Sequence, residues 1–372
     1  MSNTLTQTSI HTLLNEIQTQ GIRLDDATDL TIREGGAGPT DHKAVTIFGN
    51  TIMIPVFSQS AKSSPFSVGT TSKTGYASLK KNNEIITTIR FIGEPKFYKE
   101  SSSDGIPFWK IARLHSKDVL ATTVLQNCIR YKEKETSCQF CAIGESLKYD
   151  TTIAYKKPHH LAEVAQKALE LDTISQFIMT TGTPASSDRG AKILFESVTA
   201  VRNVVNIPIQ VQCEPPDNFE WFSLLKEAGA SSIGMHLEAV SNRVRNKIMP
   251  GKASVSLSYY FDAFTSAVSV FGKGNVSTYI LAGLGDTQEE ILKMSQKLIA
   301  IGVYPFVVPF VPIRNTPLEN HNSPNKEFMH GILDPLANQL VAAGMTSDTI
   351  SSGCAKCGAC STLSTFEKKH AL

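Results

Sequence analysis

The feature that most constrains the fold is an alternation of short apolar runs and amphipathic stretches that begins near residue 120. The apolar runs predict strands, and the stretches with 3.6-residue periodicity predict helices. Their alternation is typical of βα units and a parallel sheet. The expected strands are residues 121–126, 176–181, 207–213, 232–237, 276–281 and 304–309, and the expected helices are residues 160–170, 191–204, 219–228, 256–270 and 287–301.

Six such units predict the α/β class, with a partial (βα)6 TIM-like barrel over residues 116–320. In barrels of this kind the chemistry lies at the C-terminal ends of the strands. Residues 1–115 are expected to be a β-rich N-terminal segment, with a structural turn at residues 35–39. Residues 321–372 are expected to hold one helix near residues 326–344 and a cysteine-bearing tail whose last dozen residues fray.

Charge and hydropathy exclude several classes of protein. Lys and Arg number 36 against 34 Asp and Glu, so the whole chain has no field that would gather nucleic acid or an anionic membrane. The longest apolar stretches fall short of the ~20 residues that span a bilayer. The first residues lack a basic region followed by an apolar core, so we expect no signal peptide and a cytoplasmic location.

Six of the seven cysteines stand in two tight groups, which a disulfide framework would not require. In a reducing compartment, thiols grouped at two-residue spacing more often hold metal than each other. The seventh, Cys213, lies in an apolar β-like run and is expected to pack in the core. The first cysteine triad is Cys128, Cys138 and Cys141, and the tail triad is Cys354, Cys357 and Cys360.

Each triad offers three thiolates and no fourth cysteine nearby. The first follows a predicted strand with C-x9-C-x2-C spacing, and the tail triad has C-x2-C-x2-C spacing. A closed structural zinc site takes four ligands, whereas three leave one position open on a metal or on one iron of a [4Fe–4S] cluster. Zinc stays an alternative for both triads, and a disordered tail with surface thiols is a further alternative for the second.

The first triad, placed after the first strand of a βα barrel, resembles the radical S-adenosylmethionine (radical SAM) superfamily, and among its members the biotin-synthase-like barrels. Most members have a C-x3-C-x2-C spacing, so this chain differs in its nine-residue first gap. The resemblance implies a [4Fe–4S] cluster on the first triad, with SAM bound at the open iron. It also favours an auxiliary iron–sulfur cluster on the tail triad, since barrel members often carry one.

Several further positions match the family's SAM site. Phe140 stands at the aromatic position whose backbone contacts the adenine. Thr181, Gly182 and Thr183 occupy the place of a Gly-Gly-Glu-like turn that offers carbonyl oxygens to the methionine ammonium. Threonines replace the first glycine and the glutamate of that turn. The backbone carbonyl oxygens can still accept hydrogen bonds from the ammonium, but the side-chain carboxylate is absent.

Three later strand ends complete the resemblance. Glu214 stands where related barrels place a contact to the ribose or the amino group. The run His236, Leu237, Glu238 resembles a His-Glu-Thr-type strand end, and Arg245 after it is expected to bind the SAM carboxylate. His236 itself is expected to be a satisfied buried histidine. Gly283 belongs to a glycine turn expected to pack on the adenine.

The resemblance implies an enzyme that cleaves SAM reductively to a 5′-deoxyadenosyl radical and abstracts hydrogen from a small organic substrate. It implies a one-electron donor such as flavodoxin or ferredoxin. Some relatives act on RNA, but the near-neutral charge and the absence of an appended RNA-binding module argue against a nucleic-acid partner. Two alternatives stay open: sulfur insertion with the tail cluster as sulfur donor, and a non-catalytic iron–sulfur or zinc protein. The loop at 35–39, the wide cysteine gap and the tail triad further resemble a radical SAM subgroup of nitrilase-linked bacterial gene clusters, which would concern nitrile or cyanide nitrogen.

Overall fold

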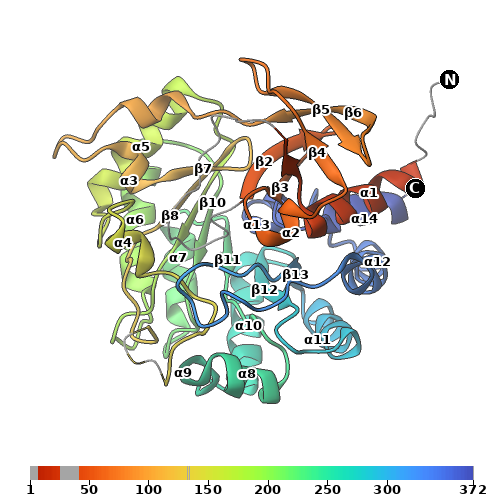
Figure 1. The fold of residues 1–372 in the computed structure, drawn as a ribbon. Coiled ribbons are helices and arrows are strands. Elements are labelled where there is room, and N and C mark those ends of the chain that lie inside the picture. Colours follow the sequence, from red (N-terminus) through yellow and green to blue (C-terminus); the bar gives the residue numbers. More distant parts are fainter. Residues whose placement is uncertain (1–6, 26–41, 132, 134, 372) are drawn as a thin grey trace.

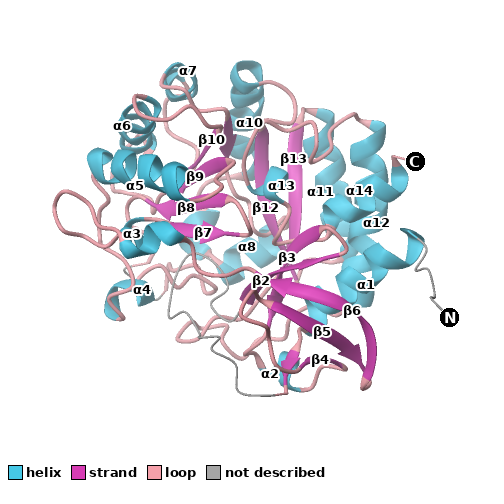
Figure 2. Ribbon diagram, turned by 90° about the horizontal axis from the view of Figure 1, so that it is seen from above, coloured by secondary structure: helices cyan, strands magenta, loops and turns pink. Residues whose placement is uncertain are grey.

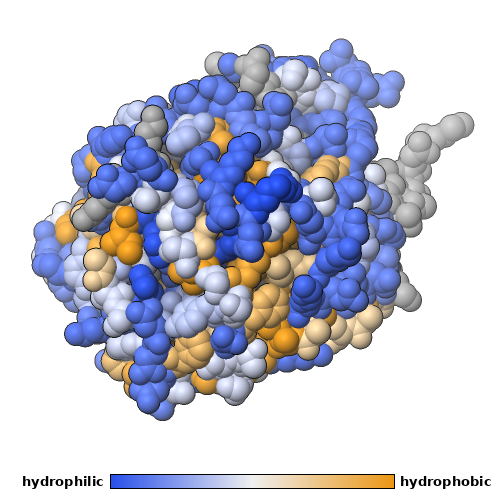
Figure 3. All heavy atoms as spheres, turned by 90° about the horizontal axis from the view of Figure 1, so that it is seen from below, coloured by the Kyte–Doolittle hydropathy of each residue, from blue (hydrophilic) through white to orange (hydrophobic). Residues whose placement is uncertain are grey.

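The computed structural model describes residues 7–25, 42–131, 133 and 135–371. The turn expected at residues 35–39 lies outside them. Within the described residues the strands form a six-stranded and a seven-stranded sheet (Figure 1). No helix in this part of the chain is both long and apolar enough to cross a membrane. Polar residues cover most of the face drawn in Figure 3.

The seven-stranded sheet confirms the predicted half-barrel. Its strands lie in the order β13-β12-β11-β10-β9-β8-β7, and all neighbours are parallel except β7, which pairs antiparallel with β8 at one edge. All six predicted strands are present, within a few residues of their expected ends. They are β8 (Val119–Thr123), β9 (Gln176–Thr180), β10 (Ile209–Gln212), β11 (Ser232–Gly234), β12 (Val276–Ala282) and β13 (Val303–Pro309), beside β7 (Arg113–His115).

The predicted helices cover the outer face of this sheet (Figure 2). Their apolar stripes bury side chains such as Leu161 and Phe264 completely against strand residues such as Phe177 and Ile209. The helices are α5 (Pro158–Leu171), α6 (Ala191–Arg202), α7 (Glu220–Glu227), α10 (Leu257–Phe271) and α11 (Gln288–Ala300). Three short helices that periodicity did not predict lie in the loops: α4 (Glu145–Lys148), α8 (Asn242–Ile248) and α9 (Pro250–Ala253).

The six-stranded sheet lies in the N-terminal segment, as its β-rich composition predicts, and has its own apolar core. Helix α1 (Gln7–Gln20), which was not predicted, buries Leu14 and Ile17 in that core. The strands are β1 (Arg23–Leu24), β2 (His42–Ile47), β3 (Asn50–Pro55), β4 (Phe66–Val68), β5 (Tyr76–Lys81) and β6 (Glu84–Phe91). A short helix, α2 (Gln59–Lys62), lies between β3 and β4, and η1 (Lys96–Lys99) and α3 (Phe108–Ile111) follow β6.

The C-terminal residues are folded, so the expectation of a frayed tail is wrong. Helix α12 (Lys326–Ala342) is followed by α13 (Cys354–Cys357) and α14 (Leu363–His370). Leu363 and Phe366 are fully buried, and the buried Glu367 carboxylate accepts hydrogen bonds from Tyr304 and Ser347. The signal in the sequence is the apolar pair Leu363 and Phe366, three residues apart. A pattern this short does not distinguish a packed helix from a frayed end.

Helix α13 lies within the curve of the half-barrel, where it contacts β13 (Figure 2). The N-terminal segment holds the loop that follows it. The Met53 amide and the Gln18 side-chain amide both donate to the Ala359 carbonyl, at 2.8 and 3.1 Å. The tail triad is therefore fixed between the two sheets.

Candidate functional site

The first cysteine triad lies on the loop that leaves the C-terminal end of β8. Two backbone hydrogen bonds tie this loop to neighbouring units of the barrel. The Ile129 amide donates to Thr183 O after β9, and the Gln139 amide donates to Ile248 O at the end of α8, each at 2.9 Å. These bonds bring the loop over the strand ends that carry Glu214 and Glu238.

The three thiols of the first triad face one another and a pair of buried charges. All are free cysteines. Burial raises the pKa of Cys138, Lys252 lowers it, and Glu238 and the other two thiols raise it further. Burial likewise raises the pKa of Cys141 to about 11, with Cys128 and Glu238 among the charges near enough to add to the shift. A bound metal cluster would stabilise the thiolate forms of these cysteines, and three cysteine ligands fit an iron–sulfur cluster.

The spacing of the thiols argues against a single metal ion. Four ligands around one zinc lie about 3.8 Å apart, since Zn–S bonds are about 2.3 Å long. In neither cysteine triad do all three sulfur atoms lie within 4.8 Å of one another. Among the described residues, only Asp104, His159 and His160 form a group of ligand atoms that close together. The wider separation suits a cluster with several irons.

Two ion pairs lie at the strand ends beside the first triad. Lys252 Nζ lies 2.5 Å from Glu238 Oε2, and Arg130 Nη2 lies 3.1 Å from Glu214 Oε2. Thr183 Oγ1 also donates to Glu214 Oε1 at 3.0 Å. Burial opposes the ionised form of Glu214, but Lys252 and Arg130 outweigh it and hold the pKa of that carboxyl below its usual range.

The backbone at Glu238 is strained. Its φ is 56°, in the left-handed region that side chains other than glycine rarely adopt. Hydrogen bonds to β12 hold it there, since the Glu238 amide donates to Tyr279 O and its carbonyl accepts from the Leu281 amide. Such strain persists where the surroundings enforce it, and it is concentrated at functional sites.

Arg245 is placed differently from the other predicted SAM contacts. Its buried guanidinium donates to the carbonyls of Leu237 (3.3 Å) and Val255 (2.8 Å) and lies 5.3 Å from the Tyr260 ring centroid. These bonds fix the segment that carries Lys252. Both Lys252 and Arg130 lie near enough to thiols of the first triad to interact with them electrostatically. Lys252 was not predicted, because no sequence pattern marks a lysine in a short, unpredicted helix.

Gly182 is required where the loops after β8 and β9 cross. A Cβ there would lie 2.2 Å from Asn127 O. The carbonyl oxygens of this turn already accept one hydrogen bond each: Gly182 O from the Thr181 hydroxyl and Thr183 O from the Ile129 amide. A carbonyl oxygen has two lone pairs, so each can still accept from a ligand.

Phe140 and Gly283 lie near one another across a small apolar cluster. Phe140 packs against a set that includes Leu284, the residue after Gly283. Gly283 has a φ of 108°, and a Cβ there would meet Pro324 at 2.9 Å. Its carbonyl accepts from His321 Nε2 at 2.8 Å. Phe140 and the residue after Gly283 therefore belong to one apolar cluster.

The other expectations from this region are met. Cys213 packs in the main core, and His236 is a satisfied buried histidine whose Nδ1 accepts from the Tyr279 amide at 3.2 Å. Burial lowers the pKa of His236 to about 3, so it is neutral.

The tail triad lies against inward-facing residues of the half-barrel. The Gly353 amide donates to Gln176 in β9, and the Cys354 amide donates to Gln210 in β10 at 3.1 Å. Each sulfur has a hydrogen-bond partner: Gln212 Nε2 lies 3.2 Å from Cys354 Sγ, the Ser116 side chain bonds Cys357, and the Tyr279 hydroxyl bonds Cys354 and Cys360. Hydrogen bonds to sulfur are typical of iron–sulfur sites, where they tune the potential.

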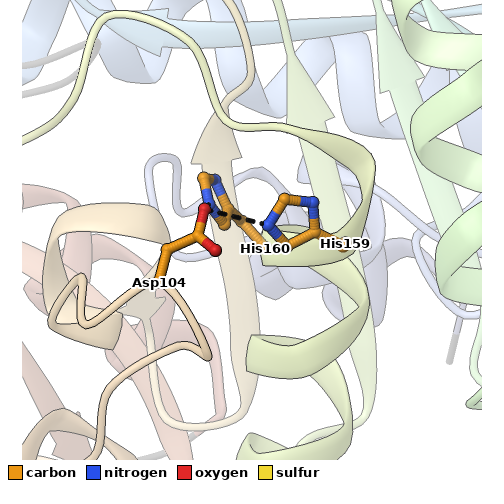
Figure 4. Close-up of side chains that lie close together, drawn as sticks. All are labelled: Asp104, His159 and His160. Carbon is orange, nitrogen blue, oxygen red and sulfur yellow. Dashed lines mark hydrogen bonds and ion pairs between the residues drawn. The ribbon is translucent and has the colours of Figure 1, made fainter.

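A further group of possible metal ligands, not predicted, joins Asp104 to His159 and His160 in the first turn of α5 (Figure 4). Asp104 Oδ2 accepts from His160 Nε2 at 3.0 Å and from His159 Nε2 at 3.2 Å. These bonds hold the pKa of Asp104 at about 2. Lys157 Nζ lies 3.5 Å from the same oxygen, so a cation already faces it.

Residues 135–298 match the model of the radical SAM superfamily. This stretch of the chain is similar to the radical SAM superfamily. Bacteriochlorophyllide c C-7(1)-hydroxylase of Chlorobaculum limnaeum is 26% identical to it over 215 residues, which cover 52% of each chain. The chain thus spans about half the length of this curated relative. The nitrilase-linked subgroup is not confirmed by these comparisons.

Two solved structures are similar to part of this chain. Methylornithine synthase is 15% identical, with a TM-score of 0.45 over 60% of this chain and 61% of that chain. A radical SAM methyltransferase from Sphaerobacter thermophilus is 13% identical, with a TM-score of 0.45 over 76% of each chain.

Proposed function

We propose that this radical SAM protein cleaves SAM reductively at a [4Fe–4S] cluster held by the first cysteine triad. The cluster would supply an electron to the SAM sulfonium and so generate a 5′-deoxyadenosyl radical that abstracts hydrogen from a small organic substrate. One observation carries this proposal above all: three free, mutually close thiols lie at the strand ends of a half-barrel, beside two buried ion pairs.

The residues around the triad have distinct proposed tasks. The carbonyls of Thr181, Gly182 and Thr183 would accept from the SAM ammonium, and Glu214 would contact the amino group or the ribose. Lys252, paired with Glu238, would bind the SAM carboxylate. Arg245 would act through Lys252 by fixing its backbone.

The tail triad would hold an auxiliary iron–sulfur centre, with Gln212, Ser116 and Tyr279 bonded to its sulfurs. We propose that residues 1–115 secure this centre, residues 116–320 carry the SAM site and residues 321–372 supply the tail ligands. The proposed setting is cytoplasmic, with flavodoxin or ferredoxin as electron donor. The comparisons favour neither sulfur insertion nor a non-catalytic metalloprotein.

The test is anaerobic reconstitution of the full chain with iron and sulfide, followed by incubation with SAM and dithionite. We expect an electron paramagnetic resonance signal that SAM perturbs, and formation of 5′-deoxyadenosine. Cys138→Ala should abolish both, whereas Cys213→Ala, which removes a core thiol outside both triads, should retain both. Full 5′-deoxyadenosine formation by Cys138→Ala would refute the assignment of this triad.

A further inference from the structure

The tail triad has a fourth neighbour of metal-ligating type. His115, the last residue of β7, places Nε2 3.4 Å from Cys360 Sγ. The residue comes from a strand 245 positions away in the sequence, and the pairing of β7 with β8 fixes where that strand ends. Among the described residues that contact the triad, Gln212, Ser116 and Tyr279 are hydrogen-bonding groups, whereas an imidazole is an ordinary metal ligand.

The distance of 3.4 Å is the separation of two ligands on one metal. A metal–sulfur bond of about 2.3 Å and a metal–nitrogen bond of about 2.0 Å at a tetrahedral angle place the two ligand atoms about 3.5 Å apart. The sulfurs have other hydrogen-bond donors, since Tyr279 already bonds Cys360. His115 Nε2 and Cys360 Sγ are hydrogen-bonded at this distance, and the same separation fits two ligands on one metal.

The number of metal ions follows from two spacings. A single tetrahedral ion would draw all four ligand atoms within about 3.8 Å, yet no three of these four lie within 4.8 Å of one another in the described structure. In a [4Fe–4S] cube each iron binds three sulfides and has room for one protein ligand. Two protein ligands on one iron, with further ligands on another, is the arrangement of a [2Fe–2S] centre.

We propose that Cys354, Cys357, Cys360 and His115 hold a [2Fe–2S] centre in which His115 and Cys360 share one iron. This inference rests on the proposed auxiliary iron–sulfur centre and deepens it. With four protein ligands the centre is closed, so it has no open iron for a substrate. Imidazole ligation raises the reduction potential above that of an all-cysteine centre.

The experiment isolates the tail centre in the full chain by replacing all three cysteines of the first triad with Ala. After anaerobic reconstitution we expect about two irons and two sulfides per chain. Pulsed electron paramagnetic resonance of the reduced protein should show strong coupling to a directly bound nitrogen, which changes on labelling with ¹⁵N-histidine. About four irons per chain, or zinc in place of iron, would overturn the proposal.

Two substitutions in the chain that lacks the first-triad cysteines test whether His115 is a metal ligand or only a hydrogen-bond donor. His115→Cys should keep the iron, lose the nitrogen coupling and lower the reduction potential, because a thiolate replaces the imidazole. His159→Ala, an exposed control histidine, should leave coupling and potential unchanged. Iron bound without strong nitrogen coupling in the parent would refute ligation by His115.

The first triad is tested separately, so failure of the proposed [2Fe–2S] centre can be distinguished from failure of the proposed SAM cleavage. Absence of any metal from the tail would overturn both this inference and the auxiliary centre. Formation of 5′-deoxyadenosine by the otherwise unmodified chain would still report on the first triad alone.

Discussion

Lys252 and Glu238 form a buried ion pair, with Nζ and Oε2 2.5 Å apart, beside the thiols of the first cysteine triad. Burial opposes the charged form of Lys252, but the Glu238 carboxylate outweighs it and raises the pKa of the ammonium above its usual range. The Lys252 ammonium therefore stays charged at the strand ends, and an anionic ligand bound there would compete with Glu238 for it.

Lys252→Met should separate SAM binding from cluster binding. The three thiols remain, so the iron content after reconstitution should stay near that of the parent chain. The effect of SAM on the electron paramagnetic resonance signal should be lost, because the cation proposed to bind the SAM carboxylate is gone. Leaving Glu238 buried without its partner should also cost about 3–5 kcal/mol of folding free energy, measured by denaturant unfolding. Lys247→Met, which removes an exposed lysine of the same segment, is the control and should change neither the SAM response nor the folding free energy. An unaltered SAM response in Lys252→Met would refute the role of Lys252.

Arg245→Lys should destabilise the fold although it keeps the charge. A lysine cannot reach the carbonyls of Leu237 and Val255 together or cover the Tyr260 ring in the same way. Loss of one hydrogen bond from a charged group costs about 1.5–3 kcal/mol, which should appear as a lower thermal midpoint. The matched control is Arg243→Lys on the exposed face of α8, where the expected change is below about 0.5 kcal/mol. Equal midpoints for the two variants would show that Arg245 does not fix this segment.

Gly182→Ala should disturb the crossing of the two loops that carry Cys128 and Thr183. Its methyl group would lie 2.2 Å from Asn127 O, so one backbone segment must move. Overpacking of this kind costs about 1–3 kcal/mol, and we expect lower iron retention by the first triad as well. Gly93→Ala, where an added Cβ meets nothing within 4 Å, is the control. Iron retention equal to that of the control would contradict the proposed tightness of the crossing.

Lys156 should make folding stability depend on pH. Its ammonium is buried with Gln126 Oε1 3.1 Å away, and burial lowers its pKa from 10.5 to about 7. The folded state therefore prefers the neutral amine. The resulting destabilisation is absent above the unfolded pKa of about 10.4, grows as the pH falls toward 7, and is complete below 7. At about 1.4 kcal/mol per pKa unit, the effect is of the order of a few kcal/mol.

Lys156→Met should remove this dependence. The free energy of unfolding of the variant, measured with denaturant at pH 6 and pH 9, should exceed that of the parent chain most at pH 6. At that pH the parent chain bears the full cost of burying the charged amine or of deprotonating it. A gain that is the same at both pH values would show that Lys156 stays charged throughout.

Local pattern was enough to predict the half-barrel. The alternation of apolar and amphipathic stretches gave all six parallel strands and the helices between them, because periodicity depends on neighbours along the chain. It did not reveal α1 or α14, whose burial depends on surfaces that distant segments supply. Nor did it distinguish Lys252 from the other basic residues near it, since only packing decides which lysine is buried.

The sequence by itself determined the order of the strands, the two cysteine triads and the strand-end positions of Glu214 and Glu238. Tertiary structure decided which charges pair: Arg130 with Glu214 and Lys252 with Glu238. It also decided that His115, far from the tail in sequence, lies beside Cys360. The physical reason is that a coordination site needs atoms within a few ångströms, whereas a one-dimensional pattern records only separations along the chain.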